Sequence, residues 1–379
     1  MRLPKYVRKE FPLIIGFVTV AAFHFFADGY LTNLKEPSIA VGLFCWLFVA
    51  SMLAAFGVVR HAEILAEKLG EPFGTLVLTI SVVGIEVSLI SAVMLTGQDA
   101  PTLARDTMFA VLMIVLNGLV GLALLIGGAR YSEQDYSLEG ARSFLSVLLP
   151  LSVFALILPN MTVSTADETF APEQSFYIAL ATVLLYGVFL GIQTMRHRSF
   201  FEEPGSALTP EESSGHSDEN EEQHELWTIR SGLYHAILLV VTILPIVLLS
   251  KRIAKVVDFG IVEVGAPVAL GGVFIAALVL APESLAALTA AAQNKLQRSV
   301  NLLLGAALAT IGLTLPAVLA ISIATGETLK LGLDPASSLL LVLTLFVSMM
   351  TFGGARTNVL QGAVHLVLFL TYVMLIFSP

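Results

Sequence analysis

Eleven apolar segments of about 18 or more residues dominate this 379-residue sequence. A helix of about that length crosses the roughly 30 Å hydrocarbon core of a lipid bilayer. The segments cover approximately residues 11–28, 38–59, 75–96, 106–129, 142–159, 175–195, 231–250, 265–292, 299–324, 336–353 and 358–378. Composition agrees, since 56% of the residues are hydrophobic, 13% are charged and the mean hydropathy is +0.86. We therefore expect an all-α membrane protein with eleven transmembrane helices.

The twenty Lys and Arg residues indicate which side of the membrane each connection faces, because cytoplasmic connections are enriched in positive charge. With the N-terminus in the cytoplasm, fourteen of them fall on the cytoplasmic side and six outside. The exception is the external connection predicted after the seventh helix, which contains Lys251, Arg252 and Lys255. Eleven spans then place the C-terminus on the outer, periplasmic side.

The helix count also predicts an internal repeat. Setting the first helix aside leaves two groups of five, and an odd number of spans per group makes the second group run opposite to the first. Inverted repeats that meet at a midplane site are a recurring plan of secondary transporters. The expected units are an N-terminal segment with the first helix at 1–37, a first five-helix repeat at 38–198, an acidic cytoplasmic loop at 199–229 and a second five-helix repeat at 230–379.

Two carboxylates interrupt the apolar segments at related places. Glu86 lies within the third segment and Glu283 within the eighth, and neither segment contains Lys or Arg. An ionised acid near the bilayer centre costs about 2.5 to 3.5 kcal/mol on insertion scales, so intramembrane acids are functional by default. Gly84 and Pro282 stand beside the acids, and we expect them to break each helix and free carbonyl groups there. The pair predicts a site that binds metal cations and protons.

A weak sequence repeat aligns the segments around the two acids. Residues 83–90 match 280–287, and aligning the starts of the helices that follow sets Asn117 opposite Thr310. A hard cation such as Ca²⁺ takes six to eight oxygen ligands, so two carboxylates need a supplement. The predicted supporting ligands are Ser88, Asn117, Ser284 and Thr310, with Ser91 and Thr314 as further neutral oxygens nearby. For Asn117 and Thr310, hydrogen bonding between helices is an equally supported interpretation.

The paired acids suggest a mechanism of exchange. Burial in an apolar environment favours a protonated carboxyl and a nearby cation favours the carboxylate, so protons and cations compete for the pair. Two carboxylates neutralise one divalent cation or hold two protons. We hypothesise that Glu86 and Glu283 alternate between these loads, and that alternating access to the two sides of the membrane converts the competition into exchange.

Several motifs, taken together, resemble one transporter family. They are VRHAEILA at 59–66, LGEP at 69–72, VGIEVSLIS at 83–91, APE at 281–283 and GARTNVLQG at 354–362. Over nearly the whole chain they resemble the bacterial ChaA-type calcium/proton antiporters of the cation/calcium exchanger superfamily. The resemblance implies eleven helices with two inverted repeats, export of cytosolic Ca²⁺ in exchange for H⁺, and one essential acid per repeat, here Glu86 and Glu283. It also implies a multi-pass protein of the bacterial inner membrane that needs no cofactor, with Ca²⁺ and H⁺ as substrates.

Other functions compete with calcium exchange. Exchange of Na⁺ or K⁺ through the same acids stays an alternative, since the wider family often has an asparagine shortly before each acid and this chain has apolar or small residues there. A channel is disfavoured because no filter loop is visible. An enzyme is not expected, because the sequence has no nucleophile elbow and no His-Glu-x-x-His motif. The net charge of −9 disfavours nucleic acid, whereas the lipid bilayer is an expected partner and a homo-oligomer stays open.

Two groups of acids face the cytoplasm in this arrangement. Residues 60–73 form an amphipathic segment expected to lie along the membrane interface, with Glu63 and Glu67 on its polar face. Residues 202–225 contain nine acids and no Lys or Arg, and we expect a solvated linker there. The alternative for both groups is attraction of cations or regulation by them, through Glu63, Glu67, Glu211, Glu212, Asp218, Glu219, Glu221 and Glu222.

The remaining polar residues near the apolar segments have structural interpretations. Arg105 and Asp106 are adjacent at the start of a segment, where an interfacial ion pair is expected. His24, His235 and His365 lie within apolar segments, and we favour packing or interface roles for them over proton relay.

Overall fold

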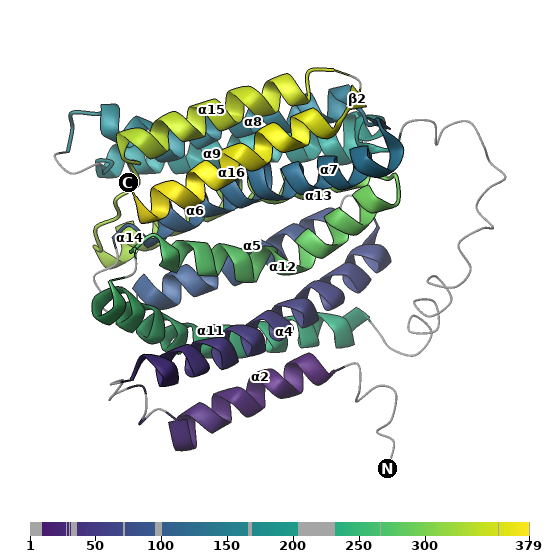
Figure 1. Cartoon of the computed structure of the whole chain (residues 1–379). Helices are drawn as coiled ribbons and strands as arrows, with labels where there is room; N and C mark the ends of the chain where they lie inside the picture. The colour runs from purple at the N-terminus through teal and green to yellow at the C-terminus, as the bar shows by residue number, and fades with distance from the viewer. Residues whose placement is uncertain are drawn as a thin grey trace, which may run out of the picture.

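A computed structural model of the chain describes residues 10–27, 29, 31, 36–70, 73–94, 101–165, 169–203, 232–265, 267–354 and 356–378. Most of the predicted acidic loop, from residue 204 to 229, lies outside these residues. Helices form nearly all of the described chain and lie alongside one another across the bundle (Figure 1).

The helices follow the order of the predicted apolar segments. The first half of the chain supplies α2 (Phe11–Ala22) with η1 (Phe23–Ala27), α4 (Pro37–Leu69), α5 (Phe73–Met94), α6 (Leu103–Met113), η2 (Ile114–Leu119), α7 (Val120–Tyr131), α8 (Leu138–Leu156), η3 (Leu158–Met161), α9 (Pro172–Gly191), η4 (Ile192–Arg196) and η5 (Arg198–Phe201). The second half supplies α11 (Gly232–Val264), α12 (Leu270–Ala292), α13 (Leu296–Ala309), η7 (Thr310–Thr314), α14 (Leu315–Thr325), α15 (Pro335–Thr351) and α16 (Val359–Phe377). The π-helical turns η2 and η7 join their neighbours, so α6 to α7 and α13 to α14 are each one continuous helical segment.

The helices that contain the two acids lie inside the bundle. From one edge to the other, Figure 1 shows α2, then α4 with α11, then α5 with α12, then α6, α7 and α13, and finally α8, α9, α15 and α16. Buried apolar side chains form two clusters, one among α2, α4, α5, α11 and α12 and a larger one that joins α5 and α12 to the helices on their other side. This layering places α5 and α12 between the two clusters.

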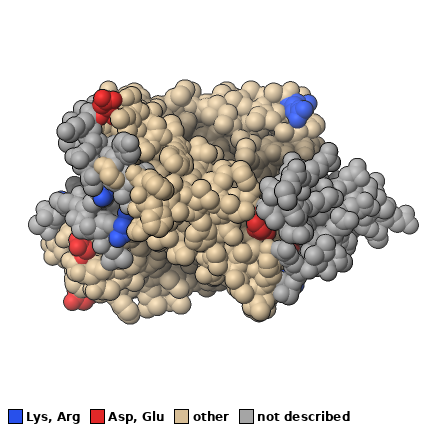
Figure 2. Space-filling view, turned by 90° about the horizontal axis from the view of Figure 1, so that it is seen from below, with Lys and Arg blue, Asp and Glu red and all other residues tan. Residues whose placement is uncertain are grey.

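The surface and the helix lengths fit a membrane protein. Among the described residues, eight helical segments are long and apolar enough to cross a bilayer, and three further apolar helices are shorter. Figure 2 shows a face that is largely uncharged, with charged side chains toward its two ends. The prediction of a helical membrane protein is confirmed, while the count of eleven spans stays a prediction.

Two helices are longer than the sequence predicted. Residues 60–69 continue α4, so the predicted break near residue 59 and the separate interfacial segment are wrong. No Gly or Pro interrupts this stretch, and the helix ends only before Gly70, whose φ of 64° favours glycine. Lys251, Arg252 and Lys255 likewise lie within α11 rather than in a connection after it.

A short antiparallel ladder departs from the all-α prediction. Strand β1 (Gln134–Asp135) pairs with β2 (Arg356–Thr357), with Gln134 opposite Thr357 and Asp135 opposite Arg356. Ion pairs of Arg356 with Glu133 at 3.1 Å and with Asp135 at 2.9 Å reinforce the ladder. The ladder joins the connection after α7 to the connection before α16.

Small residues let two helix pairs approach closely, as is usual where apolar burial alone cannot drive association in lipid. A Cβ added at Gly272 on α12 would lie 2.5 Å from the Asp106 carbonyl carbon and 2.6 Å from the Thr107 nitrogen on α6. On α16, a Cβ at Gly362 would lie 2.8 Å from the Gly121 oxygen of α7. Gly272 therefore fixes how closely α12 lies beside α6.

Candidate functional site

The two predicted acids lie on adjacent helices of the bundle interior. Glu86 is on α5 and is only 1% exposed, and Glu283 is on α12 and is partly buried. Their carboxylates are close enough to interact electrostatically, and α5 and α12 pack against each other. The structure therefore brings together the two acids that lie 197 positions apart in the sequence.

Neither acid lies at a helix break. The prediction that Gly84 and Pro282 interrupt their helices is wrong, because α5 and α12 continue through them. Pro282 still lacks an N–H, so one helical carbonyl on α12 loses its usual donor. The irregular backbone instead occurs in the helical segments packed beside α5 and α12, at η2 and η7.

The π-helical turn η7 supplies a direct partner to Glu86. The Thr310 hydroxyl donates a 2.9 Å hydrogen bond to Glu86 Oε2, and both side chains are buried. Thr314, one turn later, lies beside the same carboxylate. Such π-turns are often found at functional sites, since the extra residue redirects side chains out of the regular helical positions.

Three buried oxygens at this place have no hydrogen-bond partner among the described residues. They are Glu86 Oε1, Glu283 Oε2 and the Thr314 hydroxyl. A buried polar group left unpaired costs about 1 to 3 kcal/mol, and more for a charged group. A proton or a cation bound between these oxygens would remove that penalty.

The other predicted supporting ligands are Asn117, Ser284 and Ser88, and for none of them does the structure give a hydrogen bond to Glu86 or Glu283. The Asn117 amide on η2 donates to the Thr344 hydroxyl at 2.8 Å, and its carbonyl oxygen lies 3.3 Å from His365 Nδ1. Ser284 donates to the Leu280 carbonyl of its own helix at 2.7 Å. Ser88 is partly buried on α5, two residues after Glu86. Of the four predicted supporting ligands, Thr310 is the one for which the structure gives a hydrogen bond to an acid.

Sequence reasoning missed one neighbour of the site. Tyr186 on α9 is 5% exposed, interacts electrostatically with Glu283 and lies beside the Thr79 hydroxyl of α5. Its ring packs on Gly312 of η7, where a Cβ would lie 2.7 Å from ring carbon Cδ2. A tyrosine in an apolar helix carries no local signal of such a contact, so only the tertiary structure reveals it.

The acids predicted to attract cations or to regulate transport divide into two groups. Glu63 and Glu67 are exposed on α4, and Glu63 lines a cavity together with Arg60 and Pro282. The acids of the loop, Glu211, Glu212, Asp218, Glu219, Glu221 and Glu222, lie outside the described residues.

The adjacent polar residues at the start of α6 form the expected ion pair. Arg105 Nε contacts Asp106 Oδ1 at 2.9 Å, so the prediction of an ion pair there is confirmed. The guanidinium also donates to the Gly332 carbonyl at 2.9 Å, which ties the start of α6 to the connection before α15.

Comparison with known proteins places this arrangement in a family. The sequence profile of the sodium/calcium exchanger family matches residues 39–195 and 234–378. The chain belongs to the sodium/calcium exchanger family. Glu86 and Glu283 of this family member lie in different matched regions, one in each.

Two bacterial relatives align with most of this chain. The sodium-potassium/proton antiporter ChaA of Escherichia coli is 41% identical over 340 residues, which cover 90% of this chain and 89% of ChaA. The protein y4hA of Sinorhizobium fredii is 43% identical over 327 residues, covering 86% of each chain. The resemblance to ChaA-type antiporters is therefore confirmed.

A solved structure supports the fold of this family member. The structure of native YfkE superposes with a TM-score of 0.72 at 17% identity, covering 97% of this chain and 100% of YfkE. At this identity the likeness shows a shared fold and carries no statement about substrates.

Proposed function

We propose that this protein is a secondary active antiporter that exports cytosolic Ca²⁺ in exchange for H⁺. Its site is the pair of acids Glu86 and Glu283, with Thr310 supporting the first. The observation that carries the proposal is the convergence of two carboxylates, each with a buried oxygen that lacks a hydrogen-bond partner among the described residues. Membership of an ion-exchanger family supports it further.

The proposed mechanism follows from the cost of charge in a membrane. Two bare carboxylates inside the bundle would carry both a desolvation penalty and mutual repulsion. One divalent cation or two protons neutralise Glu86 and Glu283 equally well. The loaded site therefore passes through a closed intermediate more easily than the empty one, and this difference couples inward movement of protons to outward movement of the cation.

The order of elements supports an inverted repeat in this proposal. In each half a 33-residue helix, α4 or α11, precedes the helix with the acid. A helical segment with a π-turn follows each acid, with η2 in the first half and η7 in the second. Each acid-bearing helix packs against the π-turn segment of the other half, α5 on η7 and α12 on η2. Two five-helix repeats after α2 would give eleven spans, as proposed from the sequence.

Location and orientation belong to the same proposal. Bacterial relatives and apolar helices support a multi-pass protein of the bacterial inner membrane. The distribution of Lys and Arg favours a cytoplasmic N-terminus and a periplasmic C-terminus. The transported ions act as substrates, and the mechanism uses no cofactor.

Exchange of monovalent cations is the second candidate. The relative ChaA, at 41% identity, is named a sodium-potassium/proton antiporter. Two carboxylates can also hold one Na⁺ or K⁺ together with one proton. The same two acids would then exchange one monovalent ion for a proton, and the ion specificity would depend on the neutral oxygens around them.

Vesicle transport tests the function and separates the candidates. Purified protein is reconstituted into acidified vesicles containing a pH dye, and CaCl₂, NaCl or KCl is added outside. We expect added Ca²⁺ to drive protons out of vesicles that contain the wild type. Vesicles that contain Glu86→Gln or Glu283→Gln should show no change in internal pH. Glu327→Gln, an exposed glutamate after α14, is the matched control and should respond like the wild type. A response to Na⁺ or K⁺ alone would select the second candidate, and wild-type rates in both site variants would overturn the mechanism.

A further inference from the structure

A cavity of about 340 Å³ lies between the start of α2 and the helix that contains Glu283. It lies among α2, α4 and α12, and Pro282, the residue directly before Glu283, forms part of its wall. Arg60 and Glu63 of α4 are the charged residues that line it, and the other lining residues are apolar. A cation that used this cavity would meet the charges of Arg60 and Glu63 before it reached the site.

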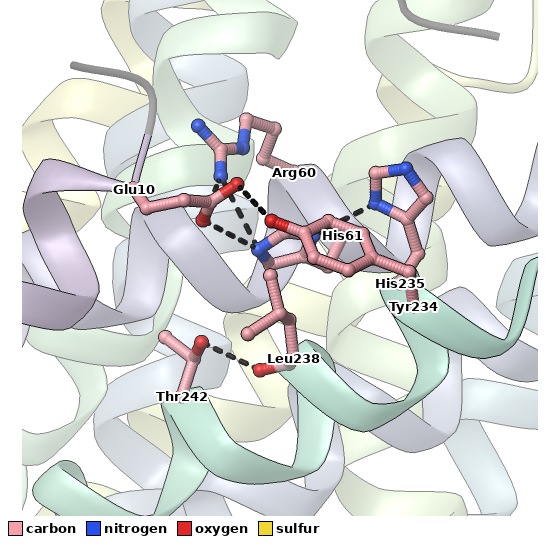
Figure 3. A network of polar contacts seen from close by, with 7 residues as sticks. All are labelled: Glu10, Arg60, His61, Tyr234, His235, Leu238 and Thr242. Atoms are coloured by element: carbon pink, nitrogen blue, oxygen red, sulfur yellow. Dashed lines mark hydrogen bonds and ion pairs between the residues drawn. The ribbon is translucent and has the colours of Figure 1, made fainter. Parts of the chain in front are cut away.

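Arg60 is held by a polar network that joins three helices. Its Nη2 contacts Oε2 of Glu10, the residue before α2, at 2.7 Å (Figure 3). The same Glu10 oxygen lies 3.2 Å from His61 Nε2, and Oε1 accepts a 3.2 Å hydrogen bond from the Tyr234 hydroxyl of α11. His61 Nδ1 lies 3.0 Å from Nδ1 of His235 on α11. The Glu10 carboxylate is therefore the centre at which α2, α4 and α11 meet.

The charge on Glu10 persists at physiological pH. Burial raises the pKa of its carboxyl, but the His61 hydrogen bond and the positive charge of Arg60 outweigh burial and lower that pKa to about 2. Among the residues that the structure describes, the groups facing this carboxylate are Arg60, His61 and Tyr234, with His235 and Lys68 farther out. An ionised Glu10 offsets the Arg60 charge, so the cavity repels cations less than it would without Glu10. The second charged residue that lines the cavity, Glu63, faces Arg298 of α13.

We propose that Glu10 is a positioning residue for cation access: by pairing with Arg60 it makes the cavity beside Glu283 less repulsive to cations. This inference rests on the proposed antiport function. It assigns a role in transport to the segment before α2, which lies outside both regions matched by the family profile. Glu10 acts on Arg60 and does not itself bind the transported ion.

The charge of the ion gives the proposal a quantitative signature. A unit charge about 10 Å from an ion, at an effective dielectric constant of about 50, changes the binding of a monovalent ion about threefold and that of a divalent ion about tenfold. Loss of the Glu10 charge should therefore raise the apparent KM for Ca²⁺ more than that for Na⁺ or K⁺, with kcat unchanged. The increase should shrink when choline chloride raises the ionic strength.

The test compares four variants in the reconstituted vesicles, with apparent KM and kcat measured for each transported ion. We expect Glu10→Gln to raise KM about threefold for a monovalent and about tenfold for a divalent ion, and Arg60→Gln to lower KM by similar factors. The double variant should return close to the wild-type KM, because both charges are gone. Glu133→Gln, which removes an exposed ion pair at the β1–β2 ladder, is the matched control with unchanged KM.

A purely structural role for Glu10 predicts different results. A purely structural role would lower kcat, measured per folded protein, for every ion alike, and adding Arg60→Gln would not restore the KM of the Glu10→Gln variant. Either result would overturn the proposal. So would a Glu10→Gln variant whose KM equals that of a wild type that carries out exchange. If Glu10→Gln does not fold, the KM of Arg60→Gln decides, since a value equal to or above the wild type contradicts the proposal. Absence of exchange in the wild type would instead refute the antiport function on which the proposal rests.

Discussion

The Thr310 hydroxyl of η7 donates a 2.9 Å hydrogen bond to the buried Glu86 carboxylate of α5. The bond joins residues 224 positions apart and connects a helix of the first half of the chain to the π-turn of the second. It leaves Glu86 Oε1 without a hydrogen-bond partner among the described residues, whereas Oε2 is held in place. One oxygen of the acid is thus oriented and the other is available to a proton or a cation.

Removal of this hydrogen bond should weaken cation binding. We expect Thr310→Val, which keeps the shape of the side chain, to raise the apparent KM for the transported cation by about tenfold to a hundredfold, because a hydrogen bond to a charged group contributes about 1.5 to 3 kcal/mol. Thr310→Ser should retain most of the affinity. Thr325→Val, at the exposed end of α14, is the control and should leave KM unchanged. Equal KM values for Thr310→Val and wild type would show that the bond has no role in binding.

The Asn117 network should contribute to stability more than to binding. Its amide donates to Thr344 and its carbonyl oxygen faces His365, so the side chain joins η2, α15 and α16. We expect a double-mutant cycle of Asn117→Ala and Thr344→Val to give a coupling free energy of about 0.6 kcal/mol and at most about 1.7 kcal/mol, the average and the maximum for hydrogen bonds between membrane helices. Thermal unfolding in detergent measures it. A large increase in cation KM with unchanged stability would instead favour the predicted ligand role.

Gly272 should be intolerant of a side chain. A Cβ there would lie 2.5 Å from the Asp106 carbonyl carbon, so Gly272→Ala must push α12 away from α6. We expect a loss of about 1 to 3 kcal/mol in the free energy of unfolding, as for other overpacked contacts. Gly187→Ala on α9 is the matched control, because a Cβ there has no neighbour within 4 Å. A Gly272→Ala variant as stable as Gly187→Ala would contradict this account of the contact.

The Glu10 network should give a stability difference that disappears in acid. The pKa of Glu10 is lowered from 4.5 to about 2, so its contribution is fully present above pH 4.5 and is lost as the pH falls toward 2. We expect the wild type to exceed Glu10→Gln by about 1 to 3 kcal/mol in unfolding free energy near neutral pH, with the two curves converging in this acid range. Tryptophan fluorescence during unfolding follows both proteins. If the difference in unfolding free energy between wild type and Glu10→Gln grew as the pH fell, the prediction would be contradicted.

Much of the candidate site was predictable because charge is rare in apolar segments. Glu86 and Glu283 stand out against sequences that must be uncharged to enter a membrane, and Thr310 follows from aligning the two halves. The π-turns were not predictable, because the extra residue shifts the phase of a helix and a segment that is apolar on all sides has no polar face to reveal the shift. Tyr186 was missed because its contacts with Gly312 and the site depend on tertiary packing.

Helix ends were less predictable than helix positions. The sequence places every apolar segment close to a helix, yet α4 and α11 extend beyond the apolar stretch into amphipathic residues. Hydropathy measures where a helix can contact lipid, whereas the helix itself ends at a backbone signal such as Gly70. The contacts around Glu10 were likewise invisible, because its partners Arg60 and Tyr234 are 50 and 224 positions away.

The most direct test of the central claim is the number of protons released when a cation binds. Purified protein in weakly buffered detergent is titrated with CaCl₂, and with NaCl or KCl, while a pH dye follows the solution from about pH 6 to about pH 8. We predict that binding to the wild type releases protons and that the double variant Glu86→Gln/Glu283→Gln releases none, because cation and protons share these two acids. Cation binding to the wild type without proton release at any pH in this range, or equal release from the double variant, would contradict the account.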